Sequence, residues 1–306
     1  MFEMFSDINS EFYQAKKVLL IDGSFVMFRT FYGYSMEKYM IDETTSNNCV
    51  FGVAKFIIKI LGHIKPDIVV FAYDISRSGH RLDLLPQYKD GRPPTPEQLI
   101  AQREPVRELI KLLGIPILEL ERYEADDIIA TLAHQANNKS YKTSIFSSDR
   151  DMYQLICENT TVLSTNQYGG FKVLDTSYVF DKYGVYPDQY PELAALVGEN
   201  ADNIPGVHGI GPVTGAKLLR EYGNLEKLLN NANKVGGKIG VSLCKSIEQV
   251  RLNRKVNELL RDAPLEYAID DLRCKNPRLD EVDEFLRSWK IPSLVGKFDK
   301  VVKNMV

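Results

Sequence analysis

Three short apolar segments, each followed at once by an aspartate, constrain the fold of this chain more than any other feature. Their length and apolar character are typical of buried β-strands rather than of helices. The segments are residues 17–21, 66–73 and 142–148, and the aspartates are Asp22, Asp74 and Asp149. Because the carboxyl ends of parallel strands meet at one edge of a sheet, we expect the three carboxylates to share one rim.

The stretches between these segments have the apolar spacing of helices. They cover about residues 50–62, 97–113 and 123–137, and residues 115–120 have the pattern of a further strand. Strands that alternate with helices indicate an α/β fold with a mainly parallel central sheet flanked by helices. Residues 75–101 form a long, polar and proline-rich connection, in which we predict no packed element.

Composition and length indicate a globular protein. The chain has 306 residues, of which 44% are hydrophobic, and 38 Lys and Arg stand against 41 Asp and Glu. At about 150 residues per domain, this length suggests two domains or one large unit with an appendage. Apolar runs are far shorter than the ~20 residues of a membrane span, so we expect no membrane partner.

The spacing of the cysteines argues against a zinc site or a redox pair, because these sites need closely spaced thiols. Isolated thiols are typical of a reducing compartment, so we predict a cytoplasmic protein. The four cysteines are Cys49, Cys157, Cys244 and Cys274.

The second part of the chain has a different pattern. After about residue 185 strand signals stop, and Gly, Asn and Pro separate short helices. We therefore predict an N-terminal extension at 1–16, an α/β core at 17–185 and a helical region at 186–306. Within the helical region, residues 201–255 hold nine Lys or Arg against four Asp or Glu, a local charge of +5. A net charge of −3 argues against nucleic acid as a partner, but this local surplus favours it.

A glycine-rich turn lies inside this basic stretch, with Gly206, Gly209 and Gly211 in eight residues. Such a turn at a helix N-terminus can present backbone N–H groups to a nucleic-acid phosphate, without reading bases. Lys217 and Arg220 would add positive charge and salt dependence. A plain connection between two helices is the other interpretation of these glycines.

Nine carboxylates are predicted at strand ends, helix starts or loops on the same rim. The ordinary interpretation of the acids at 124–127 is a helix N-terminus stabilised by the helix dipole. Crowded carboxylates, however, either raise one another's pKa or bind hard cations, and ligands that are all oxygen favour Mg²⁺ or Mn²⁺ over zinc. Two such ions can assist hydrolysis of a phosphodiester. The nine are Asp22, Asp74, Glu124, Asp126, Asp127, Asp149, Asp151, Glu199 and Asp202.

Six motifs occur in one order between about residues 17 and 290. They are Leu20-Ile-Asp22-Gly, Val70-Phe-Ala-Tyr-Asp74, Tyr88-Lys89-Asp-Gly-Arg92, Tyr123-Glu-Ala-Asp-Asp127, Ser148-Asp149-Arg-Asp151-Met-Tyr-Gln-Leu155 and Asp202-Asn-Ile-Pro-Gly-Val-His-Gly-Ile-Gly211. With these motifs the chain resembles the 5′-nuclease (flap endonuclease) family, which includes the 5′-3′ exonuclease domain of bacterial DNA polymerase I and stand-alone phage and bacterial enzymes.

The resemblance implies a PIN/5′-nuclease-like core, an arch at about 75–105 and a helix-hairpin-helix-type element that binds duplex DNA. It implies a monomeric, Mg²⁺-dependent enzyme of DNA replication and repair, in a bacterium or encoded by a phage, that cleaves 5′ flaps, nicks and 5′ ends. Mn²⁺ is expected to substitute for Mg²⁺, and K⁺ is a candidate ion at the hairpin.

The resemblance also implies a role for each matching residue. Asp22, Asp74, Glu124 and Asp126 correspond to a first metal site, which Asp127 supports, and Asp149, Asp151, Glu199 and Asp202 correspond to a second. Lys89 and Arg92, with Tyr88 beside them, correspond to residues that stabilise the transition state. Arg29 and Arg81 correspond to residues that contact substrate phosphates, beside the hairpin glycines and Lys217.

The chain departs from the family pattern at Glu199, where aspartate is usual. The longer side chain leaves open a second interpretation, a protein that binds branched DNA with impaired catalysis. A related ribonuclease is a third interpretation. No polymerase segment follows residue 306, so we expect a free-standing nuclease.

Overall fold

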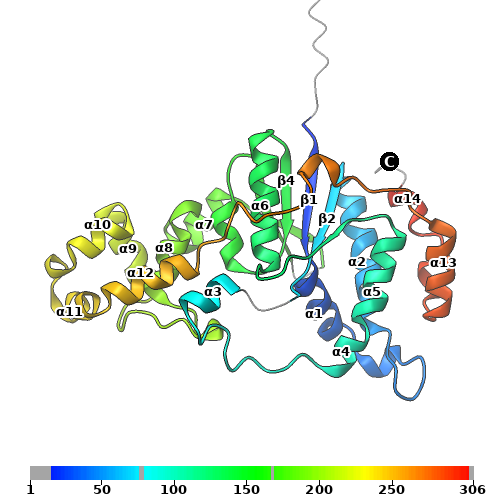
Figure 1. The fold of residues 1–306 in the computed structure, drawn as a ribbon, viewed down its shortest axis with the longest axis horizontal. Coiled ribbons are helices and arrows are strands. Elements are labelled where there is room, and N and C mark those ends of the chain that lie inside the picture. Colours follow the sequence, from blue (N-terminus) through cyan, green and yellow to red (C-terminus); the bar gives the residue numbers. More distant parts are fainter. Residues whose placement is uncertain (1–14, 76–78, 167–168, 303–306) are drawn as a thin grey trace, which may run out of the picture.

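A six-stranded sheet forms the centre of the molecule (Figure 1). The computed structural model describes residues 15–75, 79–166 and 169–302. The strand order is β3-β2-β1-β4-β5-β6, with parallel pairing except between β5 and β6. This arrangement confirms the predicted mainly parallel sheet. The strands are β1 Lys17–Asp22, β2 Ile68–Ala72, β3 Ile117–Leu118, β4 Lys142–Phe146, β5 Thr160–Thr165 and β6 Phe171–Leu174.

Helices cover both faces of this sheet and continue beyond it. They are α1 Gly23–Gly33, α2 Asn48–Ile64, α3 Gly79–Leu84, α4 Glu97–Ala101, α5 Arg103–Leu112, α6 Ala125–Asn138, α7 Thr176–Tyr183, α8 Tyr190–Val197, α9 Pro212–Tyr222, α10 Leu225–Asn230, α11 Gly237–Lys245, α12 Ile247–Val256, α13 Leu279–Ser288 and α14 Asp299–Val302. Short 3₁₀ turns include η2 Arg150–Leu155 and η4 Asn200–Asp202.

Alternate side chains of β1 enter two different apolar cores. Val18 and Leu20 pack in the core that contains α6, and Leu19 and Ile21 pack in the core that contains α2. All four side chains are fully buried. A strand that is apolar on both faces needs helices on both sides, which explains its continuous apolar sequence.

Three expectations about the elements are wrong in the described residues. The strands β5 and β6 were not predicted, because β5 is rich in threonine and lacks an extended apolar run, and β6 is only four residues long. The expected helix at 97–113 is two helices, broken at Gln102, whose buried Oε1 accepts the N–H groups of Cys49 and Val50 at the start of α2. The connection at 75–101 is not free of packed elements, because it contains α3 and α4.

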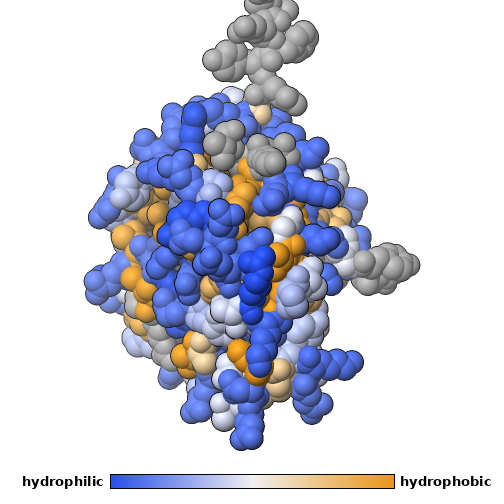
Figure 2. Space-filling view, turned by 90° about the vertical axis from the view of Figure 1, so that its right-hand side faces the viewer, coloured by the Kyte–Doolittle hydropathy of each residue, from blue (hydrophilic) through white to orange (hydrophobic). Residues whose placement is uncertain are grey.

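The helical region separates into two parts at opposite ends of the molecule (Figure 1). Helices α8 to α12 extend from the α6 side, whereas α13 and α14 pack on α5 and α2. Phe285 and Leu286 of α13 are buried in the core on that side. The face over α13 and α5 is mainly hydrophilic (Figure 2). Among the described residues, no helix is long and apolar enough to cross a membrane.

Candidate active site

The acids that follow β1 and β4 each stabilise the turn after their own strand. Asp22 accepts the N–H of Phe25 at 2.8 Å as the N-cap of α1, and Asp149 accepts the N–H of Asp151 at 2.8 Å. Ser147 joins the two strand ends, since its Oγ donates to Asp22 at 2.9 Å and accepts from the N–H of Asp149 at 3.1 Å. Asp22 and Asp149 therefore lie at the same edge of the sheet, as their positions at strand ends predict.

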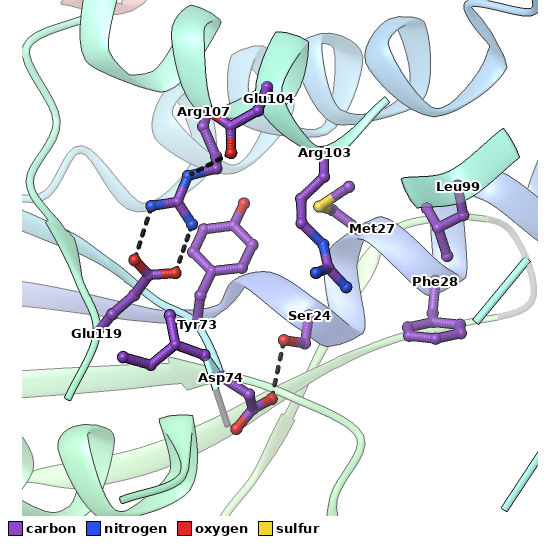
Figure 3. A pocket seen from close by; sticks show the side chains of 11 residues that line it. Ser24, Met27, Phe28, Tyr73, Asp74, Leu99, Arg103, Glu104, Arg107 and Glu119 are labelled. Atoms are coloured by element: carbon purple, nitrogen blue, oxygen red, sulfur yellow. Dashed lines mark hydrogen bonds and ion pairs between the residues drawn. The ribbon is translucent and has the colours of Figure 1, made fainter. Parts of the chain in front are cut away.

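Asp74 follows β2 and connects two further elements. One carboxylate oxygen accepts from Oγ of Ser24 at 2.9 Å, and the other accepts from the N–H of Ala125 at 2.8 Å. The second bond places the carboxylate at the N-terminus of α6, where the helix dipole favours negative charge. Asp74 also lines a cavity of about 300 Å³ beside α1 and α5 (Figure 3).

Glu124 is the N-cap of α6 and the meeting point of three side chains from the predicted arch. Nζ of Lys89 donates to its carboxylate at 2.8 Å, and the hydroxyl of Tyr88 donates at 3.2 Å. Nη1 of Arg81 lies 3.3 Å away. Tyr88 is buried, so its hydroxyl holds the Glu124 carboxylate from inside the protein and does not line an open site.

Asp127 is fully buried beside this cluster, where its Oδ2 accepts the N–H of Glu124 at 3.2 Å. Arg81 binds it through two parallel bonds of 2.7 and 2.9 Å. The structure contradicts the prediction that Arg81 contacts substrate phosphates, because its side chain is 2% exposed and committed to this ion pair. Burial alone would lower the pKa of Arg81, but the bonds from Asp127 outweigh it and raise the pKa.

The acids of the loop after α8 are held less firmly. Asp202 forms an ion pair with Arg92, and its backbone carbonyl accepts the N–H of Lys89 at 3.0 Å. Glu199 is exposed, and among the described residues no hydrogen bond or ion pair holds its side chain. Three of the predicted site residues, Lys89, Arg92 and Asp202, thus meet through tertiary contacts alone.

The carboxylates at the rim act on one another electrostatically. Burial raises the pKa of Asp22 to about 7, and Asp74 and Asp149 add to the rise. Burial, and then Asp149 and Asp22, raise the pKa of Asp126 well above its usual value. Burial and Asp149 do the same to Asp151. Burial is the largest cause of each shift, and the additional rise due to Asp149 shows that these carboxylates lie close together.

The donor set suits a hard divalent cation, because it consists of mutually repelling carboxylates without His or Cys. In the described residues, however, no three His, Cys, Asp or Glu side chains converge in ligating geometry. Lys89 bonds to Glu124, and Arg92 bonds to Asp202. Ion binding would therefore require carboxylates to rotate and to exchange these cationic partners for the metal.

The glycines of the hairpin between α8 and α9 differ in role. A Cβ on Gly206 would lie 1.9 Å from the carbonyl oxygen of Val197, so this glycine permits close packing of the hairpin. Gly209 has a φ of +84°, and a Cβ there would meet open space. Gly211 is the N-cap of α9, ahead of Pro212. Gly209 and Gly211 therefore remain candidates for phosphate contact.

The predicted basic contacts lie at separate places on the surface. Lys217 and Arg220 of α9 are exposed near the hairpin. Arg29 of α1 is exposed at the edge of a different hollow, which it lines together with Lys55 and Lys59. The structure does not bring Arg29 and the hairpin together.

Several site residues were missed from the sequence. Ser24 and Ser147 bond to the rim acids Asp74 and Asp22, and each serine lies two residues from an acid of a recognised motif. Gln154, at the end of the fifth motif, is buried and bonds to residues 257 and 259. Asn253 carried no signal, since a lone asparagine on a helix is ordinarily exposed.

Two family descriptions cover most of the chain. Residues 17–184 match the 5'-3' exonuclease N-terminal resolvase-like domain, and residues 185–280 match the 5'-3' exonuclease C-terminal SAM fold. DNA polymerase I of Mycobacterium tuberculosis H37Rv is 37% identical over 259 residues, which are 84% of this chain and 29% of that protein. The chain thus spans less than a third of the polymerase relatives it matches. A 5'-3' exonuclease of Aquifex aeolicus is 31% identical over 289 residues, 94% of this chain and 97% of that protein.

Solved structures of similar fold come from bacteriophage T5. The T5 5'-exonuclease with bound zinc ions matches with a TM-score of 0.68 at 21% identity, over 95% of this chain and 98% of that one. The T5 flap endonuclease in a complex with DNA and metal ions matches with a TM-score of 0.65 at 19% identity, over the same shares. Family matches across both regions, with a relative of similar length, show that this chain belongs to the 5'-3' exonuclease family.

Proposed function

We propose that this protein is a Mg²⁺-dependent, structure-specific 5′ nuclease that hydrolyses DNA at 5′ flaps, nicks and 5′ ends during replication or repair. The observation that carries the proposal is the cluster of Asp22, Asp126, Asp149 and Asp151 at the sheet edge, in which burial and the nearby charge of Asp149 raise the pKa of each of the other three acids. Lys89 and Arg92 of the predicted arch form ion pairs with two further acids of the predicted metal sites, Glu124 and Asp202.

The acids divide into two candidate metal sites. Asp22, Asp74, Glu124 and Asp126 would hold a first ion, and Asp149, Asp151, Glu199 and Asp202 a second. When bound, such ions supply Lewis-acid stabilisation of the attacking and leaving oxygens of a phosphodiester. The arrangement of acids without a zinc-type ligand favours Mg²⁺ or Mn²⁺.

Lys89 and Arg92 supply positive charge for the scissile phosphate. Each is bonded to an acid of the predicted metal sites, Lys89 to Glu124 at 2.8 Å and Arg92 to Asp202. Release of these partners would free both cations to stabilise negative charge that develops on phosphate oxygens. Tyr88, bonded to Glu124, keeps that carboxylate in place.

The hairpin and α9 would hold duplex DNA through its backbone. The N-terminus of α9 lies at Gly211, and Lys217 and Arg220 are exposed on the same helix. Backbone N–H groups and lysines bind phosphates of any sequence, as expected for an enzyme that recognises structure. The T5 relative solved with DNA and metal ions supports this partner and this class of cofactor.

Cleavage of a labelled 5′-flap duplex tests the proposal. We expect cleavage at the flap junction with Mg²⁺ or Mn²⁺ and none with EDTA, and slower cleavage of an RNA flap of the same geometry. Equal cleavage with and without EDTA, or no cleavage with either ion, would contradict it.

The exposed Glu199 favours one second candidate, a branched-DNA-binding protein with impaired hydrolysis. Its side chain has no hydrogen bond or ion pair among the described residues, so it need not reach the second metal site. Glu199→Asp decides between the two. A gain of tenfold or more in the cleavage rate would support impaired hydrolysis in the wild type. An unchanged rate would show that the glutamate already acts as the metal ligand in place of aspartate.

A further inference from the structure

The end of α12 and the residues after it, 253–263, form a segment that we name the strap. The strap has no acid of the predicted metal sites. It nevertheless forms hydrogen bonds with the hairpin, with α3, with η2 and with α6. The contacts with α3, η2 and α6 are made by buried polar side chains of those elements. The proposed function assigns these side chains no chemical role.

The first contact fixes the hairpin that carries Glu199 and Asp202. Asn253 is fully buried on α12. Its Nδ2 donates to the carbonyl of Ala195 at 3.0 Å and to the carbonyl of Pro205 at 2.7 Å. One side chain therefore holds both the helix before the loop and the loop itself.

The second contact fixes η2, which carries Asp151. Gln154 lies one turn after Asp151 and is 6% exposed. Its Nε2 donates to the carbonyl of Asn257 at 2.9 Å, and its Oε1 accepts the N–H of Leu259 at 3.1 Å. The amide thus satisfies a donor and an acceptor of the strap backbone at once.

The third contact fixes α3 and α6. Nε of Arg81 donates to the carbonyl of Val256 at 3.1 Å. Its ion-pair partner Asp127 accepts the N–H of Leu260 at 3.0 Å. Asp127 is the direct neighbour of Asp126, and Arg81 also lies 3.3 Å from Glu124. The position of these two acids is therefore tied to the strap.

We propose that Arg81 and Gln154 are positioning residues. Through the strap they hold Glu124 and Asp126 at the start of α6 in a fixed position relative to Asp151 of η2, and neither contacts substrate. This inference rests on the proposed function.

Buried hydrogen bonds of this kind rigidify the groups that they join. The strap is joined by those of Arg81, Gln154 and Asp127, although Nδ2 of Asn257 in the strap has no hydrogen-bond partner among the described residues. A displacement of about 1 Å in a catalytic group can reduce a rate about 100-fold, so the register of these acids matters for the chemistry.

Gln154→Met tests the strap against a matched control, Gln102→Met. Gln102 is also a buried glutamine, 1% exposed, that satisfies two backbone N–H groups, but it lies against α2. Both variants should unfold at lower temperature than the wild type. At a temperature where circular dichroism shows both folded, only Gln154→Met should lose single-turnover flap cleavage, by about 100-fold. Its flap affinity in EDTA should stay within about twofold of wild type.

Arg81→Lys separates positioning from phosphate contact. A lysine keeps the charge but cannot reproduce the two parallel bonds to Asp127. We expect about 100-fold slower cleavage, about tenfold weaker Mn²⁺ binding in a titration without DNA, and an unchanged salt dependence of flap binding. A phosphate contact would instead leave the Mn²⁺ affinity unchanged.

The outcomes separate this inference from the proposed function. If wild type cleaves but Gln154→Met and Arg81→Lys cleave equally fast, or if Gln102→Met loses as much rate, the strap has no positioning role. If wild type cleaves nothing, the proposed function fails, and the Mn²⁺ titration still tests the strap. An altered salt slope for Arg81→Lys would overturn its assignment.

Discussion

The acids at the sheet edge and the acids of the hairpin differ in how they are held. Asp22, Asp74 and Glu124 each accept at least two hydrogen bonds, and for Asp22 one of them comes from the helix that follows its own strand. On the hairpin, Asp202 depends on Arg92, whose side chain is 48% exposed, and Glu199 is exposed. The comparison suggests that one group is organised in advance and the other is completed by tertiary contacts and substrate.

The largest effect should come from loss of a sheet-edge acid. Asp74→Ala removes a carboxylate of the first site, which should reduce flap cleavage by ~10³-fold or more, because a bound metal supplies several kcal/mol of transition-state stabilisation. Asp202→Ala should reduce the rate of flap cleavage less, by about tenfold to 100-fold. Single-turnover rates measure both, with flap binding in EDTA as the control. Equal losses would remove the distinction between the two groups.

The second effect concerns stability and pH. The pKa of Asp22 is about 7 in the fold against a usual value of 3.8, so the folded protein holds this proton where the unfolded chain has lost it. The contribution of this proton to the free energy of unfolding is on the order of 4 kcal/mol. It is fully present below about pH 4 and is lost as the pH rises through about 7. Denaturant titrations in EDTA should show that the free energy of unfolding falls less between about pH 4 and 7 for Asp22→Asn than for the wild type. Parallel profiles would contradict this assignment.

Lys89→Ala tests the cation that is bonded to Glu124 of the sheet-edge group. Lys89 would act on charge that develops in the transition state, so we expect a loss of about 100-fold in rate with little change in flap affinity. Lys55→Ala, which alters an exposed lysine of α2, serves as the control for loss of one surface charge. Loss of affinity alone would reassign Lys89 to binding of the ground state.

Lys217→Ala should have the smallest effect. An exposed lysine on α9 that neutralises one phosphate should weaken duplex binding about equally for all sequences. The slope of log affinity against log salt should fall by about 0.9. An unchanged slope would mean that α9 lies outside the DNA interface.

Local sequence patterns predicted the sheet edge well. Apolar segments that end in aspartate place Asp22, Asp74 and Asp149 correctly, because the end of a strand and the cap of the next helix are local features. The same patterns failed for β5, whose threonines have no apolar period, and for α3, which lies in a proline-rich connection.

Arg81 shows the limit of reasoning from a motif. An arginine in a polar connection is expected at the surface, whereas here it crosses to a carboxylate 46 positions away. Nothing local in the sequence signals that partner. Asn253 and Gln154 were missed for the same reason, since each bonds to backbone groups that lie 48 or more positions away.

The sequence alone determined the kind of chemistry available to this protein: a parallel sheet, oxygen ligands at its carboxyl edge, a basic hairpin and membership of a nuclease family. Only the tertiary structure decided which cations neutralise those oxygens and which buried amides align them. The physical reason is range: backbone periodicity and capping act over a few residues, whereas burial pairs charges and amides wherever the folded chain brings them together.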